Sequence, residues 1–259
     1  MCGVVLAAGA GTRFGGPKAL ARQPDGTPWL ELAVRRLEAA GCSPILVVLG
    51  AASDDAAPLV PLPACTVVAT KWFEGLGESL CTALTWLGEP GGYAGSATDE
   101  VRTDPISSST DDLAEVQIGT PTKTLTKSRA QNGMDPQFPT EVKRQVPAKN
   151  HADAMLVITV DTPDMPAAAC ARLMQGASTS SLARAVYGGK PGHPVLIGRE
   201  HWAALELSAA GDTGAGPYLR RAGALEIECA DLWHGHDIDY KQETDNGFNM
   251  NDGRDIDSR

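Results

Sequence analysis

Residues 4–20 read Val-Val-Leu-Ala-Ala-Gly-Ala-Gly-Thr-Arg-Phe-Gly-Gly-Pro-Lys-Ala-Leu, and this stretch decides the fold that we expect. Its first part, from Gly3 to Ala8, is an apolar run typical of a buried parallel strand. The run ends in a glycine-rich loop that carries two basic residues, Arg13 and Lys18. Backbone amides in such a loop bind anions, and Arg and Lys side chains bind phosphate oxygens. The stretch therefore predicts an α/β fold with a phosphate site at its first strand-to-helix turn.

Two widespread phosphate-binding motifs do not fit this loop. A dinucleotide fingerprint, G-x-G-x-x-G, would need glycine where Phe14 stands. A P-loop would need its glycine directly before the lysine, but Pro17 separates Gly16 from Lys18. The alternatives left are an ordinary glycine-rich turn and a different kind of nucleotide-binding loop.

Composition limits the class of protein. The chain has 259 residues, of which 42% are hydrophobic and 21% are charged, enough for one large α/β domain or two small ones. Its net charge of −10 argues against nonspecific binding of nucleic acid. An acidic protein that handles nucleotides needs a divalent cation between its carboxylates and the phosphates. For a protein that binds nucleotides, this charge therefore predicts a divalent cation as the cofactor.

The chain shows no sign of a membrane or export segment. No apolar run approaches the length of about 20 residues that spans a bilayer. Met1-Cys2-Gly3 leads straight into the first strand, without the pattern of a signal peptide. The six cysteines are scattered, form no C-x-x-C pair and mostly sit in apolar segments. We expect reduced, buried thiols, no zinc site, no membrane partner and a cytoplasmic location.

Strand and helix patterns alternate along the chain. The apolar spacing of Leu30, Ala33, Val34 and Leu37 predicts a helix over residues 28–40. Similar patterns predict helices over 80–87, 166–175, 199–208 and 214–221. Strands are predicted over 44–49, 65–70, 154–161, 182–187, 195–197 and 225–229. A short helix and turn is predicted over 53–63, and a tight loop over 188–194. This order predicts a three-layer α/β fold with a largely parallel sheet. Ligands bind such sheets at the carboxyl ends of the strands.

Two segments depart from this alternation. Residues 93–150 are rich in Ser, Thr, Asp, Lys, Gln and Pro and show no sustained periodicity. A structureless loop of this length is improbable inside a compact domain, so we expect a long, disordered polar insertion. Residues 241–259 form a polar tail.

The glycine loop resembles a longer signature, L-A-A-G-x-G-x-R-x-G-x-P-K, which it matches from Leu6 to Lys18 with one extra glycine before the proline. This signature belongs to the MobA-like NTP transferases, nucleotidyltransferases built like the sugar-nucleotide pyrophosphorylases. The resemblance covers residues 3–90 and 153–240 and is strongest to molybdenum cofactor cytidylyltransferases and nicotine blue oxidoreductase-like proteins. It implies a Rossmann-like nucleotide-diphospho-sugar transferase fold and a single nucleotidyltransferase domain over residues 1–259.

Further segments carry the same resemblance. The segment from Trp72 to Ala83 is similar to the family's W-x-x-G-x-x-x-S-L-x-x-A-L, and residues 190–194 are similar to its R-x-G-H-P loop. Asp161, after a buried strand, resembles the metal-binding Asp of the family's G-D-x-P motif. Asp-Ile-Asp at residues 237–239 matches the start of the family's D-I-D-T-P-E-D, but Tyr240 then departs from it. We favour Asp237 as the second metal carboxylate, because it follows the last predicted strand at the expected distance, but the tail offers two alternatives, Asn249-Met250-Asn251 and Asp255-Ile256-Asp257. The departure also puts the family's C-terminal lid helix in doubt.

The resemblance implies a role for each of these positions. Arg13, Lys18 and Asp161 would be catalytic, Asp161 and Asp237 would bind Mg²⁺, and His193 would contact the acceptor. The implied nucleotide-binding residues are Leu6, Ala7, Ala8, Gly9, Gly11, Thr12, Lys18, Gly77 and Ser79. Two plainer readings stay open, since Ser79 could cap a helix and His193 could brace its turn.

The implied reaction transfers CMP from CTP to a phosphorylated acceptor such as molybdopterin and releases pyrophosphate. Its partners would be a nucleoside triphosphate, that small acceptor, and a molybdoenzyme or its chaperone. Leu6-Ala7-Ala8-Gly9 favours the cytidylyl branch over the guanylyl branch, which usually reads L-A-G-G. An NAD(P)H-dependent oxidoreductase of the nicotine blue type is the runner-up, although the dinucleotide fingerprint is missing. A noncatalytic nucleotide-binding protein is the third alternative.

Overall fold

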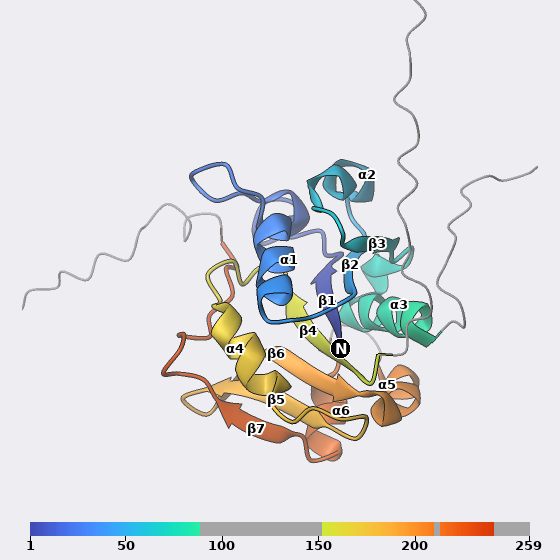
Figure 1. The fold of residues 1–259 in the computed structure, drawn as a ribbon. Coiled ribbons are helices and arrows are strands. Elements are labelled where there is room, and N and C mark those ends of the chain that lie inside the picture. The colour runs from blue at the N-terminus through green and yellow to red at the C-terminus, as the bar shows by residue number, and fades with distance from the viewer. Residues whose placement is uncertain (89–151, 210–212, 241–259) are drawn as a thin grey trace, which may run out of the picture. The chain divides into compact units, whose positions relative to one another are not determined.

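A single mixed sheet forms the centre of the fold (Figure 1). The computed structural model describes residues 1–88, 152–209 and 213–240, so the predicted insertion at 93–150 and the tail at 241–259 lie outside the described residues. The sheet has seven strands in the order β3-β2-β1-β4-β6-β5-β7. Their bounds are Cys2–Ala7 for β1, Ile45–Leu49 for β2, Cys65–Val68 for β3, Ala154–Thr159 for β4, Leu182–Tyr187 for β5, Lys190–Gly198 for β6 and Leu225–Glu228 for β7.

Most neighbouring strands of this sheet are parallel. β1 pairs in parallel with β2 and β4, β2 with β3, and β5 with β7. Among these strands, only β6 runs antiparallel to its neighbours, β4 and β5. β1 is buried along its whole length, which explains why its sequence is a continuous apolar run. The predicted α/β fold with a largely parallel sheet is confirmed.

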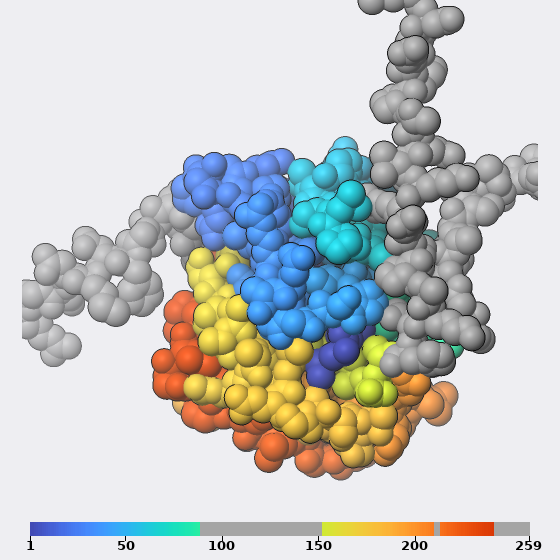
Figure 2. Space-filling model, in the orientation of Figure 1, coloured from blue at the N-terminus to red at the C-terminus, as the bar shows by residue number. Residues whose placement is uncertain are grey.

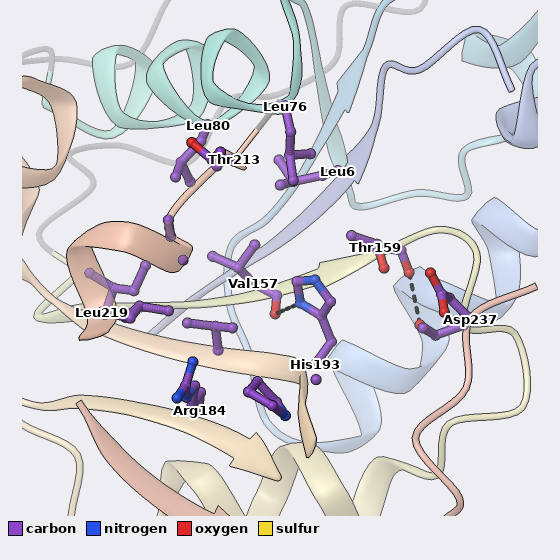
Figure 3. A pocket seen from close by; sticks show the side chains of 18 of the residues that line it. Leu6, Leu76, Leu80, Val157, Thr159, Arg184, His193, Thr213, Leu219 and Asp237 are labelled. Carbon is purple, nitrogen blue, oxygen red and sulfur yellow. Dashed lines mark hydrogen bonds between the residues drawn. The ribbon is translucent and has the colours of Figure 1, made fainter. Parts of the chain in front are cut away.

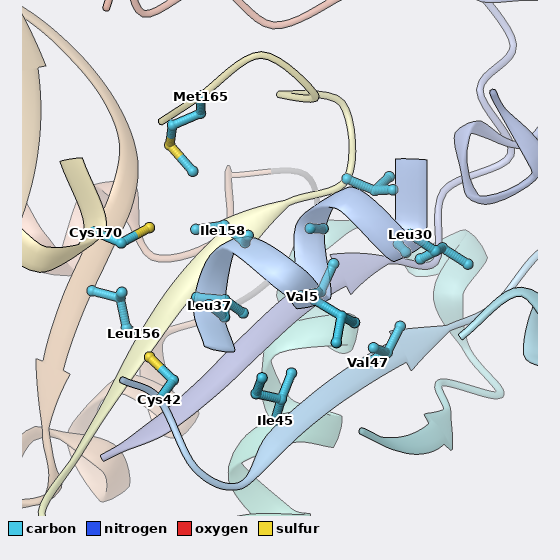
Figure 4. Close-up of a cluster of buried hydrophobic side chains, with 14 of the residues drawn as sticks. Val5, Leu30, Leu37, Cys42, Ile45, Val47, Leu156, Ile158, Met165 and Cys170 are labelled. Atoms are coloured by element: carbon cyan, nitrogen blue, oxygen red, sulfur yellow. The ribbon is translucent and has the colours of Figure 1, made fainter. Parts of the chain in front are cut away.

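Helices α1 (Trp29–Ala39) and α4 (Ala167–Met174) cover one face of the sheet and lie in front of it in Figure 1. The two helices also contact each other, as the space-filling view shows (Figure 2). The apolar stripe predicted between residues 30 and 37 is buried here against Val5, Val47 and Ile158 (Figure 4). This face therefore holds the first of two hydrophobic cores.

Helices α3 (Leu76–Gly88), α5 (Trp202–Ser208) and α6 (Gly216–Arg221) cover the opposite face. Successive side chains of a strand point to opposite faces, so β1 gives Val5 and Ala7 to the first core and Val4 and Leu6 to the second. The predicted stripe between residues 80 and 87 of α3 is buried in this second core. Two helical layers thus enclose the sheet, which confirms the predicted three-layer arrangement.

Short helices complete the connections between these elements. They are α2 (Ser53–Ala56) and four 3₁₀ helices, namely η1 (Lys18–Leu20), η2 (Ala57–Leu59), η3 (Trp72–Glu74) and η4 (Arg199–His201). The short helix and turn predicted over residues 53–63 correspond to α2 and η2.

The prediction of a tight loop over residues 188–194 is wrong. β5 and β6 form an antiparallel hairpin in which Tyr187 pairs with Lys190. Only Gly188 and Gly189 make the turn, with φ of 58° and 78°, values that glycine adopts without strain. His193 therefore lies on a strand of the sheet.

No helix in the described part of the chain is long and apolar enough to cross a membrane. All six cysteines are free thiols, and four of them are buried. Burial raises the pKa of Cys42 to about 11 and that of Cys170 to about 12. These two thiols stay protonated at neutral pH and are therefore poor nucleophiles.

Candidate functional site

A glycine loop joins β1 to η1 and forms one side of the candidate site. Gly11 has a φ of +60°, and a Cβ atom there would lie 1.9 Å from the carbonyl oxygen of Gly16, so only glycine fits. The carbonyl of Gly11 accepts hydrogen bonds from the amides of Gly15 and Gly16 at 2.9 and 3.1 Å. Because these two amides already donate hydrogen bonds within the loop, they are not free to bind an anion. More of the predicted anion binding therefore falls to Arg13 and Lys18.

Lys18 lies between two carboxylates. Its ammonium group donates to Oδ2 of Asp161 at 2.9 Å and to Oδ1 of Asp239 at 3.1 Å. The Lys18 side chain is only 14% exposed, whereas Arg13, 3.6 Å from Oδ2 of Asp239, is 72% exposed. Burial alone would lower the pKa of Lys18, but the hydrogen bonds and charges of Asp161 and Asp239 outweigh it and raise that pKa. Lys18 is therefore fully charged at neutral pH.

Asp161, Asp237 and Asp239 form an acidic cluster. Each offers a carboxylate oxygen, and these oxygens all lie within 4.8 Å of one another. Oδ1 of Asp161 is buried and has no hydrogen-bond partner. An unpaired buried carboxylate oxygen is costly, and oxygen atoms of this kind are the ligands of hard divalent cations. The cluster therefore fits a divalent metal ion, which would supply positive charge beside bound phosphates.

The segment after β7 brings two of these aspartates to the site. Trp233 packs edge-on against Tyr187, with ring centroids 5.4 Å apart. The amide of Ile238 donates to the carbonyl of Asp161 at 2.9 Å. The first contact holds the segment at the carboxyl end of β5, and the second holds it just beyond the carboxyl end of β4, so the aspartates on either side of Ile238 lie beside Asp161.

Sequence reasoning favoured Asp237 and left Asp239 without a role. The structure brings both to Asp161, and Asp239 is the one that pairs with Lys18 and Arg13. The signal was present in the Asp-Ile-Asp pattern, because residues two apart on an extended segment point to the same side. The sequence pattern therefore carried a signal for Asp239 as well as for Asp237.

A pocket of about 420 Å³ opens beside the acidic cluster (Figure 3). Asp161 and Asp237 line one part of it, and Arg184 of β5 and His193 of β6 line another. The apolar lining comes from both the sheet and the helices, and includes Leu6, Val157, Val195, Ile197, Leu76, Leu80 and Leu219. The volume lies within the range of about 300–1,000 Å³ that small-molecule sites occupy.

Residues 3–225 match the sequence model of the MobA-like NTP transferase domain. The chain belongs to the MobA-like NTP transferase family. The resemblance expected from the glycine loop is thereby confirmed, and this places the protein in a family of nucleotidyltransferases.

One curated protein and three solved structures that resemble this chain each align with nearly all of it. Nicotine blue oxidoreductase of Paenarthrobacter nicotinovorans is 26% identical over 248 residues, which are 92% of this chain and 91% of that protein. Rv0371c from Mycobacterium tuberculosis H37Rv has a TM-score of 0.59 and 18% identity over 93% of this chain and 94% of its own. Its manganese complex has a TM-score of 0.51 and 18% identity over 88% and 87% of the two chains. A nucleotidyl transferase from Methanothermobacter thermautotroptrophicus has a TM-score of 0.58 and 15% identity over 93% of each chain.

His193 of this MobA-like protein is held by the neighbouring strand. Its Nδ1 lies 3.3 Å from the carbonyl oxygen of Val157. A carbonyl only accepts, so Nδ1 carries the proton and Nε2 of the neutral ring is a hydrogen-bond acceptor. Burial lowers the pKa of His193 and prevails over the opposing charges of Asp161 and Asp237. His193 is therefore neutral at pH 7 and braces β6 against β4 while it lines the pocket.

Besides Lys18 at the start of η1, the predicted nucleotide-binding residues of the MobA-like domain lie in two places. The first group sits at the carboxyl end of β1 and in the loop beyond it, and consists of Leu6, Ala7, Ala8, Gly9, Gly11 and Thr12. Of this group, Leu6 lines the pocket and Thr12 is exposed.

The second group lies in the first turn of α3. That helix begins at Leu76, so Ser79 lies inside the turn and is only 3% exposed. The reading of Ser79 as a helix cap is therefore wrong. Gly77 is buried in the same turn, and their neighbours Leu76 and Leu80 are the residues of this turn that line the pocket.

Proposed function

We propose that this protein is a Mg²⁺-dependent nucleotidyltransferase that transfers CMP from CTP to a phosphorylated acceptor such as molybdopterin and releases pyrophosphate. The observation that carries the proposal is the meeting of Lys18 with the acidic cluster at the carboxyl ends of β1 and β4. Nucleotidyl transfer must neutralise charge on both sides of the reacting phosphorus. Arg13 and Lys18 can neutralise part of this charge directly. The three carboxylates can do so through the divalent cation that they would hold.

Different residues of the chain would carry out different parts of this reaction. Arg13 and Lys18 would bind the triphosphate and stabilise the charge of the leaving pyrophosphate. Asp161, Asp237 and Asp239 would hold Mg²⁺, which neutralises charge on the phosphate oxygens. The acceptor phosphate would attack the α-phosphorus in line with the leaving group, without a covalent enzyme intermediate. Lys18, now paired with two carboxylates, would turn to the phosphates once nucleotide and metal are bound.

The nucleotide, the acceptor and the metal ion in this proposal each rest on a different observation. The sequence Leu6-Ala7-Ala8-Gly9 favours CTP over GTP. Molybdopterin is favoured as the acceptor by the structural likeness to a molybdopterin-guanine dinucleotide biosynthesis protein A from Archaeoglobus fulgidus. Mg²⁺ is favoured by the oxygen-only ligand set, and the related Mycobacterium tuberculosis protein was solved in complex with manganese. A molybdoenzyme or its chaperone would receive the product.

An NAD(P)H-dependent oxidoreductase is the second candidate. It rests on the 26% identity with nicotine blue oxidoreductase over 92% of this chain. The loop after β1 lacks the dinucleotide fingerprint. Hydride transfer to or from a nicotinamide also gives no role to a cluster of three carboxylates beside a lysine.

Ligand-dependent thermal stability separates these candidates. CTP, GTP, ATP, UTP and NADPH would each be added with and without Mg²⁺, because a ligand that binds only the folded state raises the melting temperature. We expect CTP with Mg²⁺ to give the largest rise, and pyrophosphate release from CTP to require molybdopterin. A rise with NADPH alone, together with no pyrophosphate release from any nucleotide, would refute the proposal.

A further inference from the structure

We infer that the pocket binds the acceptor as an apolar-faced ring, and that Arg184 recognises a neutral hydrogen-bond acceptor on that ring, such as a carbonyl oxygen or a ring nitrogen. The inference rests on the proposed function, because it places the acceptor's phosphate beside the acidic cluster. Arg184 would then determine which phosphorylated compound is used.

The strand pattern places Arg184 on the pocket side of the sheet. Its neighbours Ala183 and Ala185 on β5 belong to the first core, so Arg184 points to the opposite face, where the second core and the pocket lie. In the sheet it pairs with Val195 of β6 on one side and with Glu226 of β7 on the other. Figure 3 shows it among the lining side chains, at a part of the pocket away from Asp237.

The guanidinium group of Arg184 is only partly satisfied. Nη2 donates to Oε1 of Glu226, and the side chain is 12% exposed. Nε is buried and has no hydrogen-bond partner. A buried N–H without an acceptor is costly, and the planar guanidinium holds its donors in a fixed direction. A ligand that brings an acceptor atom to Nε would remove this cost.

The charge balance selects a neutral group rather than a second anion. Among the described residues that line the pocket, Arg184 is the only permanent cation, and Glu226 already neutralises it. Asp161 and Asp237 add negative charge at the other part of the lining. Even when a metal ion compensates those carboxylates, a carboxylate or second phosphate at the Arg184 end meets a guanidinium already paired with Glu226, so its desolvation is not repaid, whereas a carbonyl oxygen costs less to desolvate.

The apolar side chains that line the pocket favour a ligand with apolar faces. Val157, Val195 and Ile197 line the pocket from the sheet, while Leu80 and Leu219 line it from the helices. A ring placed between these two layers removes apolar surface from water on both of its faces. The pocket thus combines aliphatic walls, one directed donor and a cluster suited to a metal-bound phosphate.

Three aryl phosphates of similar ring size test the inference. They are 4-methylumbelliferyl phosphate, with a carbonyl at the end of the ring system away from the phosphate, 2-naphthyl phosphate, with no group there, and 6-phosphonooxy-2-naphthoate, with a carboxylate there. Their dissociation constants would be measured by calorimetry with Mg²⁺ present. We expect the carbonyl compound to bind about tenfold more tightly than the other two, as one hydrogen bond to a charged donor provides.

Variants of the pocket identify the donor. Arg184→Met and Arg184→Lys should both abolish the preference for the carbonyl compound, because lysine keeps the charge but lacks the Nε donor. Glu226→Gln should instead favour the carboxylate compound, because it frees the charge of Arg184. Arg172→Met is the matched control: Arg172 also pairs with a carboxylate, that of Asp231, but does not line the pocket. The Arg172→Met variant should prefer the carbonyl compound as strongly as the wild-type protein does.

Two results would overturn the inference: equal binding of the three compounds to the wild-type protein, or a carbonyl preference that survives in folded Arg184→Met and Arg184→Lys. Thermal shifts with CTP and Mg²⁺ on the same variants distinguish this failure from failure of the proposed function. A normal CTP shift without any carbonyl preference rejects only the ring subsite. A carbonyl preference without any nucleotide shift or pyrophosphate release rejects nucleotidyl transfer and leaves the ring subsite standing.

Discussion

At the scale of single residues, pairing of charges decides what the candidate site can bind. The carboxylate of Asp161 uses one oxygen for Lys18 and keeps the other buried and unpaired. Lys18 and Arg13 supply two positive charges against three carboxylates, so the site keeps a net negative charge that attracts a cation.

Asp161→Asn should abolish Mg²⁺-dependent turnover while the fold is kept. Asparagine preserves the shape of the side chain but removes its charge, so the affinity for a hard cation falls. A loss of several kcal/mol of transition-state stabilisation corresponds to a rate loss of about a thousandfold. Pyrophosphate release measures it. The control is Asp164→Asn, since Asp164 is exposed and contacts Gln23; turnover of Asp161→Asn within about tenfold of that control would contradict the assignment.

Lys18→Met and Arg13→Met should differ in stability, although both residues belong to the same loop. Lys18 is largely buried between Asp161 and Asp239, and its removal leaves two facing carboxylates, at a cost of about 1–3 kcal/mol. Arg13 is mostly exposed, so its removal should change stability by less than about 0.5 kcal/mol. Urea unfolding measures both changes, and both variants should bind CTP more weakly. Equal stabilities would show that the Lys18 pairs contribute nothing.

His193 should make the protein less stable as the pH falls. Its pKa is lower in the folded protein than in the unfolded chain, so the unfolded chain binds more protons below the ordinary histidine pKa of about 6.5. This part of the stability is present above about pH 6.5 and is lost as the pH falls below it. His193→Gln should therefore lose less stability between about pH 7.5 and about pH 5.5. The pKa of His234 is also lowered, but that contribution is common to both proteins; identical pH dependences would contradict the prediction.

At the scale of elements, α1 both covers the sheet and supports the site. Arg36 of this helix is 8% exposed, and its Nη2 donates to the carbonyl of Pro163. Pro163 lies in the loop between β4 and α4 that also carries Asp161. A cationic side chain on the buried face of α1 therefore anchors the loop of the acidic cluster.

Arg36→Met should weaken metal binding as well as the fold. Methionine keeps the apolar contacts but leaves the carbonyl of Pro163 without its donor, so we expect a stability loss of about 1–3 kcal/mol. Loss of the anchor should lower the affinity for Mn²⁺ by roughly tenfold, as changes next to metal ligands do. Calorimetric titration with Mn²⁺ measures it. Arg35→Met is the control, because Arg35 is exposed on the same helix and pairs with Glu31; equal affinities in the two variants would reject the anchoring role.

At the scale of the whole molecule, two distant parts of the chain build one sheet. β1 and β4 pair directly, although the predicted insertion lies between them in the sequence. Leu87, before the insertion, and Ala152, after it, are buried in the same hydrophobic cluster. The second core is thus shared by residues on either side of the insertion.

Replacing residues 93–150 with a short Gly/Ser linker should leave a folded protein that still binds CTP. Closing a shorter loop costs less conformational entropy, and Leu87 and Ala152, on either side of the replaced segment, are buried in the same core. Thermal unfolding and the CTP thermal shift measure the outcome. Aggregation, or a folded protein that has lost the CTP shift, would show that the insertion contributes to the fold or to the site.

The sequence by itself determined the local structure and the family. Apolar runs predict buried strands and helical spacing predicts α1 and α3, because burial imposes these short periods directly on the chain. The loop after β1 and the family signature are likewise contiguous, and Gly11 is required there by a contact within the loop itself. Even the Asp-Ile-Asp pattern was visible, although only Asp237 of its two carboxylates was predicted to bind the metal.

Only the tertiary structure decided which of these residues meet. Lys18 pairs with carboxylates 143 and 221 positions away in the sequence, and Arg184 meets Glu226 only through the register of β5 and β7. The hairpin that holds His193 was missed for a similar reason, since strand pairing depends on a partner and not on the segment alone. Sequence periodicity reports the face of an element that is buried, whereas packing of distant elements decides which charges and donors come together.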